Sequence, residues 1–138
     1  MEKEIKSWVI KANESVNNSF KVIYEKEEKH EDDSDLTVLR LEHEKFKEMG
    51  MDASEEFMQG YDLQCSQFAR VFRWAVNKYY EDLAKDLKNK GYTPTDMRII
   101  WMESNRDSMV GIQDNMNLII MVQNTDYGFT ITVMSNAE

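Results

Sequence analysis

The spacing of apolar residues changes once along this chain of 138 residues, close to residue 90. Before that point they recur every three or four positions, the period of an α-helix, and after it they alternate, the period of a β-strand. Helices followed by strands are typical of an α+β domain with helices on one face of an antiparallel sheet. We therefore predict a single α+β domain over residues 1–138, mainly helical over 1–90 and mainly β over 92–138.

Three stretches of the first block have helical periodicity. Residues 3–27 carry one apolar stripe, and residues 36–49 carry another that ends at Gly50, where a left-handed residue often closes a helix. The strongest pattern covers residues 52–89, where apolar side chains keep one phase around roughly half of the helix circumference. We therefore predict three N-terminal helices, the third of which is capped by Asp52 and forms the centre of the domain.

Residues 20–41 also fit a second interpretation. The stretch Phe20–Tyr24 is rich in β-branched and aromatic residues, and Leu36–Leu41 alternates as a strand does. As strands the two would pair in a β-hairpin, whereas as helices the second would be capped by Asp35. We prefer the helices, because the apolar stripe of the first helix continues into this region without a break in phase.

The second block is expected to form a three-stranded antiparallel β-meander. Its first strand begins at about Thr95 and is apolar on most of both faces, so we place it in a central or covered position. Residues 105–115 are expected to form a loop, and the other two strands are expected at residues 116–122 and 127–133. A three-stranded sheet leaves open edges, which pairing across a homodimer would cover.

The chain is acidic, with a formal net charge of −9. Such a charge is repelled by nucleic-acid phosphates and by anionic membranes, so we expect neither as a direct ligand and favour a basic protein partner. No apolar run is long enough to span a bilayer, and the N-terminal residues contain no apolar signal segment. We therefore expect a cytoplasmic protein, although a secreted protein expressed without its signal would look the same.

The acidic residues are densest over Glu25–Asp35, where seven of eleven residues are Asp or Glu. Carboxylates this close repel one another and nothing apolar anchors them, which indicates a solvated loop. A calcium loop is disfavoured because the stretch lacks the glycine that the sharp turn requires. We interpret the stretch as a candidate recognition patch for a basic partner, formed by Glu27, Glu28, Glu31, Asp32, Asp33 and Asp35.

One large aromatic residue interrupts the pattern of the third helix. Trp74 projects into the polar arc of the helix beside Arg70, and Leu63 falls on the same outer stripe. Either another element covers this tryptophan, or it belongs to an oligomer or partner interface, where Trp and Arg are enriched. We add Leu63, Arg70 and Trp74 to the candidate partner-binding residues.

The residues that carry chemistry are sparse. Cys65 is the one cysteine and falls on the apolar face of the third helix, where we expect a buried, inert thiol. The two histidines, His30 and His43, lie near no cysteine and lack metal-ligand spacing, and we expect His43 at the surface. No dinucleotide-binding, phosphate-binding or zinc-protease motif is present, so we predict no catalytic residue, no metal site and no cofactor.

These observations favour a non-enzymatic protein that binds and inhibits or neutralises a basic protein, such as a nuclease or a nucleic-acid-binding enzyme. Immunity proteins, antitoxins and phage-encoded inhibitors are often of this short, acidic type, a comparison of type alone. The alternative is a small-molecule-binding protein or modest enzyme, with a pocket between the sheet and the third helix lined by Tyr61, Tyr79, Arg98 and Trp101.

Overall fold

A computed structural model describes residues 2–29, 34–93, 97–104, 108–113 and 117–136. Within these residues, two strands lie between the first and second helices, so the order of elements differs from the predicted one. The elements are α1 (Glu2–Glu14), β1 (Phe20–Lys29), β2 (Ser34–His43), α2 (Glu44–Met49), the 3-10 helix η1 (Gly50–Asp52), α3 (Glu55–Asn89), β3 (Ile99–Ser104), β4 (Ser108–Gln113), β5 (Leu118–Thr125) and β6 (Gly128–Asn136).

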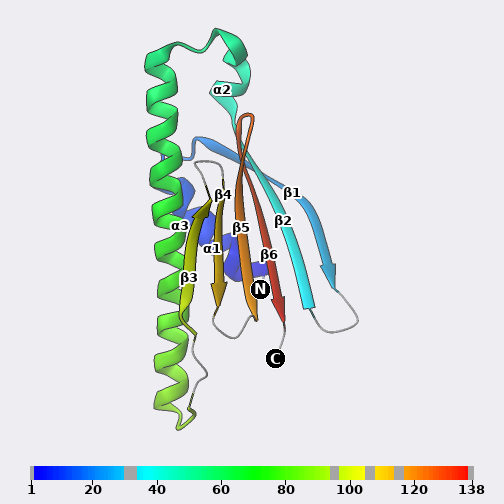
Figure 1. Ribbon diagram of the computed structural model, residues 1–138, viewed down its shortest axis with the longest axis vertical. Helices are drawn as coiled ribbons and strands as arrows, with labels where there is room; N and C mark the ends of the chain where they lie inside the picture. Colours follow the sequence, from blue (N-terminus) through cyan, green and yellow to red (C-terminus); the bar gives the residue numbers. More distant parts are fainter. Residues whose placement is uncertain (1, 30–33, 94–96, 105–107, 114–116, 137–138) are drawn as a thin grey trace.

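The strands form one antiparallel sheet in the order β1-β2-β6-β5-β4-β3. Helices α1 and α3 lie on the same face of this sheet, with α3 along the side formed by β3 and β4 (Figure 1). The core between the two layers contains Ile5 and Trp8 of α1, Phe68 and Phe72 of α3, and the inward residues of the strands. The opposite face of the sheet is covered by no described element.

The predicted fold of three helices on a three-stranded meander is wrong, because the sheet has six strands. The first helix ends at Glu14 rather than near residue 27, and the chain turns at Asn17 and Asn18, which both have positive φ. Asn13 then fixes the start of β1, since its side chain both donates to the carbonyl of Phe20 at 2.8 Å and accepts from its N–H at 3.2 Å.

The β-hairpin kept as the alternative for residues 20–41 is the correct topology, since β1 and β2 are paired over their length. Much of the stretch Glu25–Asp35, predicted as a loop, therefore belongs to strands, and Asp35 lies within β2 instead of capping a helix. Pairing of β2 with β6 stabilises this hairpin. The two strands approach closely at Gly128, where a Cβ atom would overlap the carbonyl oxygen of Leu41.

Residues 105–115, also predicted as a loop, include the strand β4. Gly111 allows this strand to lie beneath the indole of Trp101, because a Cβ at position 111 would be 2.6 Å from the ring. The preceding strand β3 begins at Ile99 and forms an edge of the sheet. Its predicted covered position is therefore wrong, and Ile100 and Met102 are about half exposed.

The long third helix is confirmed as a single element, Glu55–Asn89, which continues through Gly60. Its N-cap is Ser54, whose hydroxyl accepts a hydrogen bond from the Phe57 N–H at 3.1 Å, and not the predicted Asp52. The chain leaves its C-terminal end through Gly91, at φ 89°. Its apolar face packs on the sheet and on α1, where Trp8 makes an edge contact with Phe72.

Candidate protein-binding surfaces

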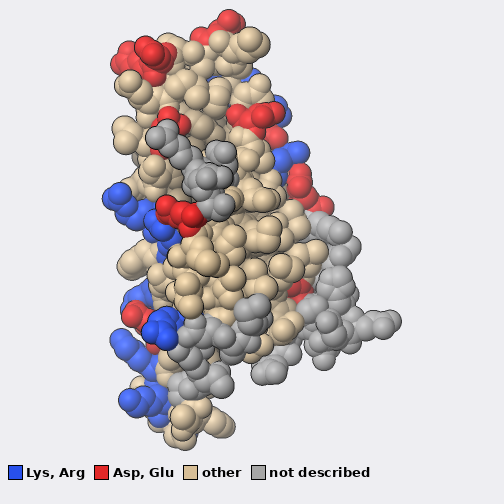
Figure 2. Space-filling view, in the orientation of Figure 1, with Lys and Arg blue, Asp and Glu red and all other residues tan. Residues whose placement is uncertain are grey.

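The first candidate surface is the end of the molecule where β2 turns into α3, which we call the acidic corner and define as residues 44–62. It contains α2, η1 and the first two turns of α3. Six carboxylates and two lysines give it a net charge of −4, and Figure 2 shows acidic side chains at this upper end. The carboxylates belong to Glu44, Glu48, Asp52, Glu55, Glu56 and Asp62.

Two methionines project from the acidic corner. Met51 is fully exposed and Met49 is 41% exposed. Both lie where α2 ends, because Gly50 between them has a positive φ of 55° that terminates the helix. Methionine is flexible and polarizable, so it adapts to apolar side chains of different shape. Exposed methionine in an acidic segment suits a partner segment that is both basic and apolar.

A buried histidine holds this corner in place. His43 was expected at the surface, but it is 3% exposed. Its Nδ1 accepts the Phe46 N–H at 3.2 Å and caps α2, and its Nε2 lies 2.8 Å from Oε1 of Gln64 on α3. Gln64 in turn donates through Nε2 to the Ser19 hydroxyl at 3.0 Å. Because Nδ1 accepts from Phe46, Nε2 is the ring nitrogen that donates to Gln64, and these contacts join β2, α2, α3 and the segment before β1.

Aromatic side chains pack around the same point. The ring of Phe46 on α2 makes edge contacts with Phe57, Tyr61 and Tyr127 at centroid distances of 5.9, 4.7 and 5.2 Å. Each such pair adds roughly 0.5–1.5 kcal/mol beyond the burial of its surface. The backbone of the acidic corner is thus anchored by buried contacts, whereas the methionines at its tip contact solvent.

The second candidate surface is the uncovered side of the sheet, which we call the open face. Strand pairing aligns its side chains in rows that run across the strands. From β2 across the sheet to β3, the first row consists of Leu36, Met134, Ile119, Ile112 and Ile100, and the second of Val38, Thr132, Met121, Val110 and Met102. On the edge strand β1, the register aligns Glu28 with the first row and Lys26 with the second. A third, polar row follows and contains Arg40, Thr130, Gln123 and Ser108.

Neither of the first two rows contains a charged residue, and Figure 2, which views this side, shows a broad uncharged centre. The third row separates them from the acidic corner, because β2 runs from Leu36 toward His43, where α2 begins. Its charged member, Arg40, is paired with Glu25 and Glu42, each at 3.1 Å. The open face is therefore apolar at one end and neutralised at the other.

The residues predicted from the sequence for partner binding do not form one surface in the described structure. Leu63 and Trp74 are exposed by 72% and 56% on α3, with the Lys11 ammonium 5.7 Å from the Trp74 ring centroid. Arg70 is also exposed on α3. Of the acidic set, Glu27 and Glu28 lie in β1 and Asp35 in β2, across the sheet from α3, whereas Glu31, Asp32 and Asp33 lie outside the described residues. Their role in binding stays a prediction.

The acidic corner was missed in the sequence. Its carboxylates are spread over 19 positions and interrupted by lysines, so their density is lower than in Glu25–Asp35. The pattern that could have indicated it is Glu48-Met49-Gly50-Met51-Asp52, in which two apolar residues flank a helix-ending glycine between carboxylates. Apolar side chains at a helix end are expected at the surface when their neighbours are carboxylates, because the charged groups stay in water.

Hollows lie between the sheet and α3, where the alternative interpretation placed a pocket, but their lining differs from the predicted one. A hollow of about 670 Å³ lies there, lined in part by Cys65, Arg73 and Glu103, and a second of about 420 Å³ includes Arg98. The other three predicted lining residues border neither. Tyr61 is buried, Tyr79 packs on Trp8 at a centroid distance of 5.6 Å, and Trp101 Nε1 donates to Asn77 at 2.9 Å.

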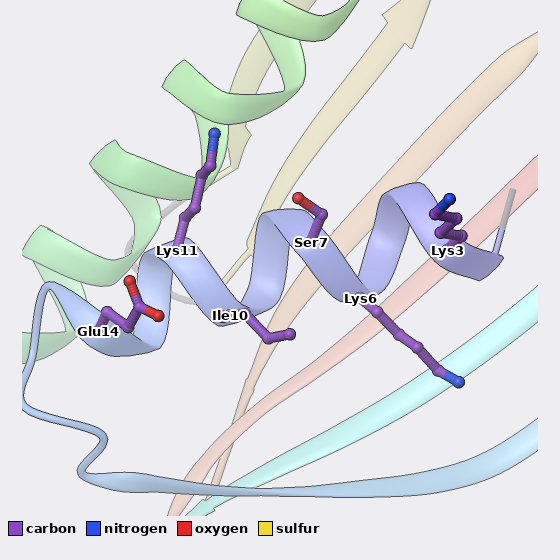
Figure 3. Close-up of a pocket in the computed structure, with 6 residues that line it drawn as sticks. All are labelled: Lys3, Lys6, Ser7, Ile10, Lys11 and Glu14. Carbon is purple, nitrogen blue, oxygen red and sulfur yellow. The ribbon is translucent and has the colours of Figure 1, made fainter.

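A third hollow, of about 600 Å³, is lined by residues of α1 alone. Figure 3 shows the six side chains projecting from one side of this helix, with Lys11 directed toward α3. The space between them is open to solvent and bounded by no second element. We interpret it as helix surface and not as a ligand pocket.

Two ionisable groups of α3, the Cys65 thiol and the Tyr61 hydroxyl, have raised pKa values that favour their uncharged forms. Burial raises the pKa of the Cys65 thiol to about 11; the hydrogen bond with Tyr61 opposes this shift, and the charge of Asp62 adds to it. Burial also raises the pKa of the Tyr61 hydroxyl, with a further contribution from Cys65. A protonated thiol is a poor nucleophile, so the half-buried Cys65 is unsuited to covalent catalysis at neutral pH.

No group of three or more His, Cys, Asp or Glu side chains in the described part of the chain is placed to bind a metal ion. The described helices include none with the length and apolar character needed to cross a membrane. No protein-family model, curated protein or solved structure matches the chain. The functional proposal therefore depends on the chemistry of the two surfaces.

Proposed function

We propose that this chain is a non-enzymatic protein that binds a basic protein partner through the acidic corner, and inhibits it by covering its basic surface. The observation that carries the proposal is Met51, fully exposed at the tip of a segment with a net charge of −4. An exposed apolar side chain in an acidic segment fits a partner segment in which lysine or arginine alternates with apolar residues.

The two kinds of side chain have different tasks in this proposal. The carboxylates, together with the net charge of −9, attract a basic partner over distance and raise the association rate. The methionines then bury apolar area and slow dissociation. A partner whose basic surface normally contacts phosphate, such as a nuclease or another nucleic-acid-binding enzyme, would lose access to its substrate when bound.

The contacts of His43 and Phe46 support the proposal, because they fix the acidic corner before a partner arrives. A segment already held in its binding conformation loses less entropy on association. Met49 and Met51 are exposed, so their side chains can adjust to a partner while the backbone of the corner stays fixed.

Methionine-methyl NMR tests the proposal directly. The partner would first be captured from cells of the source organism with the intact chain as bait, and a synthetic peptide of alternating Lys and Leu would serve as a basic apolar probe. On titration with either, we expect the methyl signals of Met49 and Met51 to shift, with those of Met102 and Met121 on the open face unchanged. Shifts confined to the open face, or no shift at saturation, would contradict the proposal.

Variants then assign the two tasks. Glu55→Gln should slow association, and Met51→Ser should speed dissociation by about tenfold. Glu81→Gln, an exposed carboxylate farther along the same helix, is the matched control and should change neither rate. Equal effects of the control and the corner variants would show that only net charge matters.

A further inference from the structure

We infer that the open face of the sheet binds a second copy of this chain, so that two sheets pack face to face across a two-fold axis. The side chains of the open face are mostly apolar. Nine of the ten side chains in the first two rows are apolar, the exception being Thr132. Ile100 and Met102 are exposed by 51% and 50%, and Met134 by 37%. A monomer rarely leaves so continuous an apolar surface in water.

Charge selects the second copy among possible occupants. Two chains of net charge −9 repel one another over most of their surfaces. From β2 to β3 the first two rows contain no charged residue, and the β1 positions that continue them, Glu28 and Lys26, carry opposite charges, so identical copies can meet there without juxtaposing large areas of like charge. A basic partner, in contrast, gains no electrostatic attraction from these rows and is better matched by the acidic corner.

The size of the surface is compatible with a dimer. Six strands at about 4.8 Å spacing and about six residues per strand give a projected face of about 24 by 20 Å, or roughly 500 Å². Side-chain relief makes the accessible area larger than this projection. It therefore approaches the roughly 800 Å² per partner that stable interfaces bury.

The row pattern also suits two-fold symmetry. A two-fold contact is self-complementary, so apolar rows of one copy would meet apolar rows of the other. The sheets would then pack about 10 Å apart, as in a β-sandwich, with side chains of both faces interdigitated. The polar row with Arg40 and Gln123 would lie at the rim, and the acidic corner beyond it would remain free in both copies.

Sedimentation velocity over about 1–200 µM protein tests the inference. We expect the wild-type chain to dimerise within this range and Met121→Lys to weaken dimerisation by about 100-fold, because the variant buries two lysines near the two-fold axis. Gln123→Lys, two residues along the same strand on the polar row, is the matched control and should change dimerisation by less than about threefold.

Two further measurements keep the inference falsifiable. If Met121→Lys does not fold, Ile100→Lys replaces a side chain already half exposed in the single chain and should also weaken the dimer. On dilution of the wild type, methyl signals of Met102, Met121 and Met134 should shift, and that of Met51 should not. A wild-type monomer throughout, or a dimer that survives the lysine variants in folded form, would overturn the inference. Neither result would affect the proposed binding at the acidic corner.

Discussion

The acidic corner and the open face present apolar side chains to solvent in opposite electrostatic settings. At the corner, Met51 is isolated among carboxylates, and on the open face, residues such as Ile112 and Ile119 stand in uncharged rows. Charge around an apolar side chain selects partners of opposite sign, whereas an uncharged apolar surface is the place where identical acidic copies can meet. The difference predicts two kinds of contact that respond differently to the same change.

The largest expected effect is a loss of stability that is concentrated in the acidic corner and is smaller in the sheet. His43→Ala should lower the free energy of unfolding by about 3 kcal/mol, because it removes the α2 cap and leaves Gln64 Oε1 without its donor. Hydrogen exchange should increase most over residues 44–62, and less in β4 and β5. Gln123→Ala on the open face is the control, with an expected change within about 0.5 kcal/mol. Equal loss of protection everywhere would show that the two regions unfold as one.

The next largest expected effect is that salt slows partner binding at the acidic corner but does not weaken dimerisation through the open face. Between about 0.05 and about 0.5 M NaCl, association with the basic partner should slow by tenfold or more, since salt screens exposed charges. Dimerisation through the open face should instead strengthen modestly, because salt screens the repulsion between two chains of net charge −9. Stopped-flow association and sedimentation at each salt concentration measure the two quantities. A dimer that weakens in parallel with partner binding would contradict the assignment of separate surfaces.

Alkaline pH should lower the free energy of unfolding through two ionisable groups of α3. The pKa of Cys65 rises in the fold from 9.0 to about 11, and the pKa of Tyr61 is also raised, chiefly by burial. A raised folded-state pKa gives stability that is complete below the unfolded-state pKa and is lost as pH rises through the folded-state value. The melting temperature should therefore fall between about pH 9 and pH 11.

Cys65→Ala should flatten that part of the pH profile, and Ser66→Ala, a change at the next residue of α3, should leave its shape unchanged. Thermal melts followed by circular dichroism at each pH provide the measurement. An unchanged slope in Cys65→Ala would show that the thiol does not contribute.

The smallest expected effect is that of the tryptophan singled out in the sequence. Trp74→Ala should speed dissociation of the basic partner by about threefold if the outer stripe of α3 extends the contact made at the corner. Ile10→Ala, a change to an equally exposed residue on α1, is the control. If the two variants behave alike in surface plasmon resonance, the tryptophan lies outside the interface and the corner acts alone.

The sequence predicted α3 well because its periodicity is local and long, and because Gly91 marks its end. It failed over residues 20–43, where helix and strand patterns are both present and the outcome depends on pairing with β6, some 90 residues away. The strand β4 was missed for a similar reason. Gly111 weakens its local pattern, yet the position is required by the indole of Trp101 on the neighbouring strand.

The candidate surfaces were less predictable than the elements. Burial of His43 depends on Gln64, 21 residues away on another element, and nothing in the local sequence of either indicates the contact. The rows of the open face follow from strand register, and a shift of one residue would turn every side chain to the other side. The carboxylates of the acidic corner could be counted in the sequence, but only the fold shows that residues 44–62 lie together at one end of the molecule.

The pairing of β2 with β6 has a consequence for how the chain is made. Among the described strands, the N-terminal hairpin and the strands β3 to β5 are joined in one sheet only through β6, which follows all of them in the sequence. A nascent chain therefore holds an unfinished edge on β2 until residues 128–136 have left the ribosome exit tunnel, and such edges recruit foreign strands. Stalling of translation shortly before residue 128 should accordingly yield a chaperone-dependent, aggregation-prone intermediate, and resumed synthesis of residues 128–136 should convert it to the native sheet.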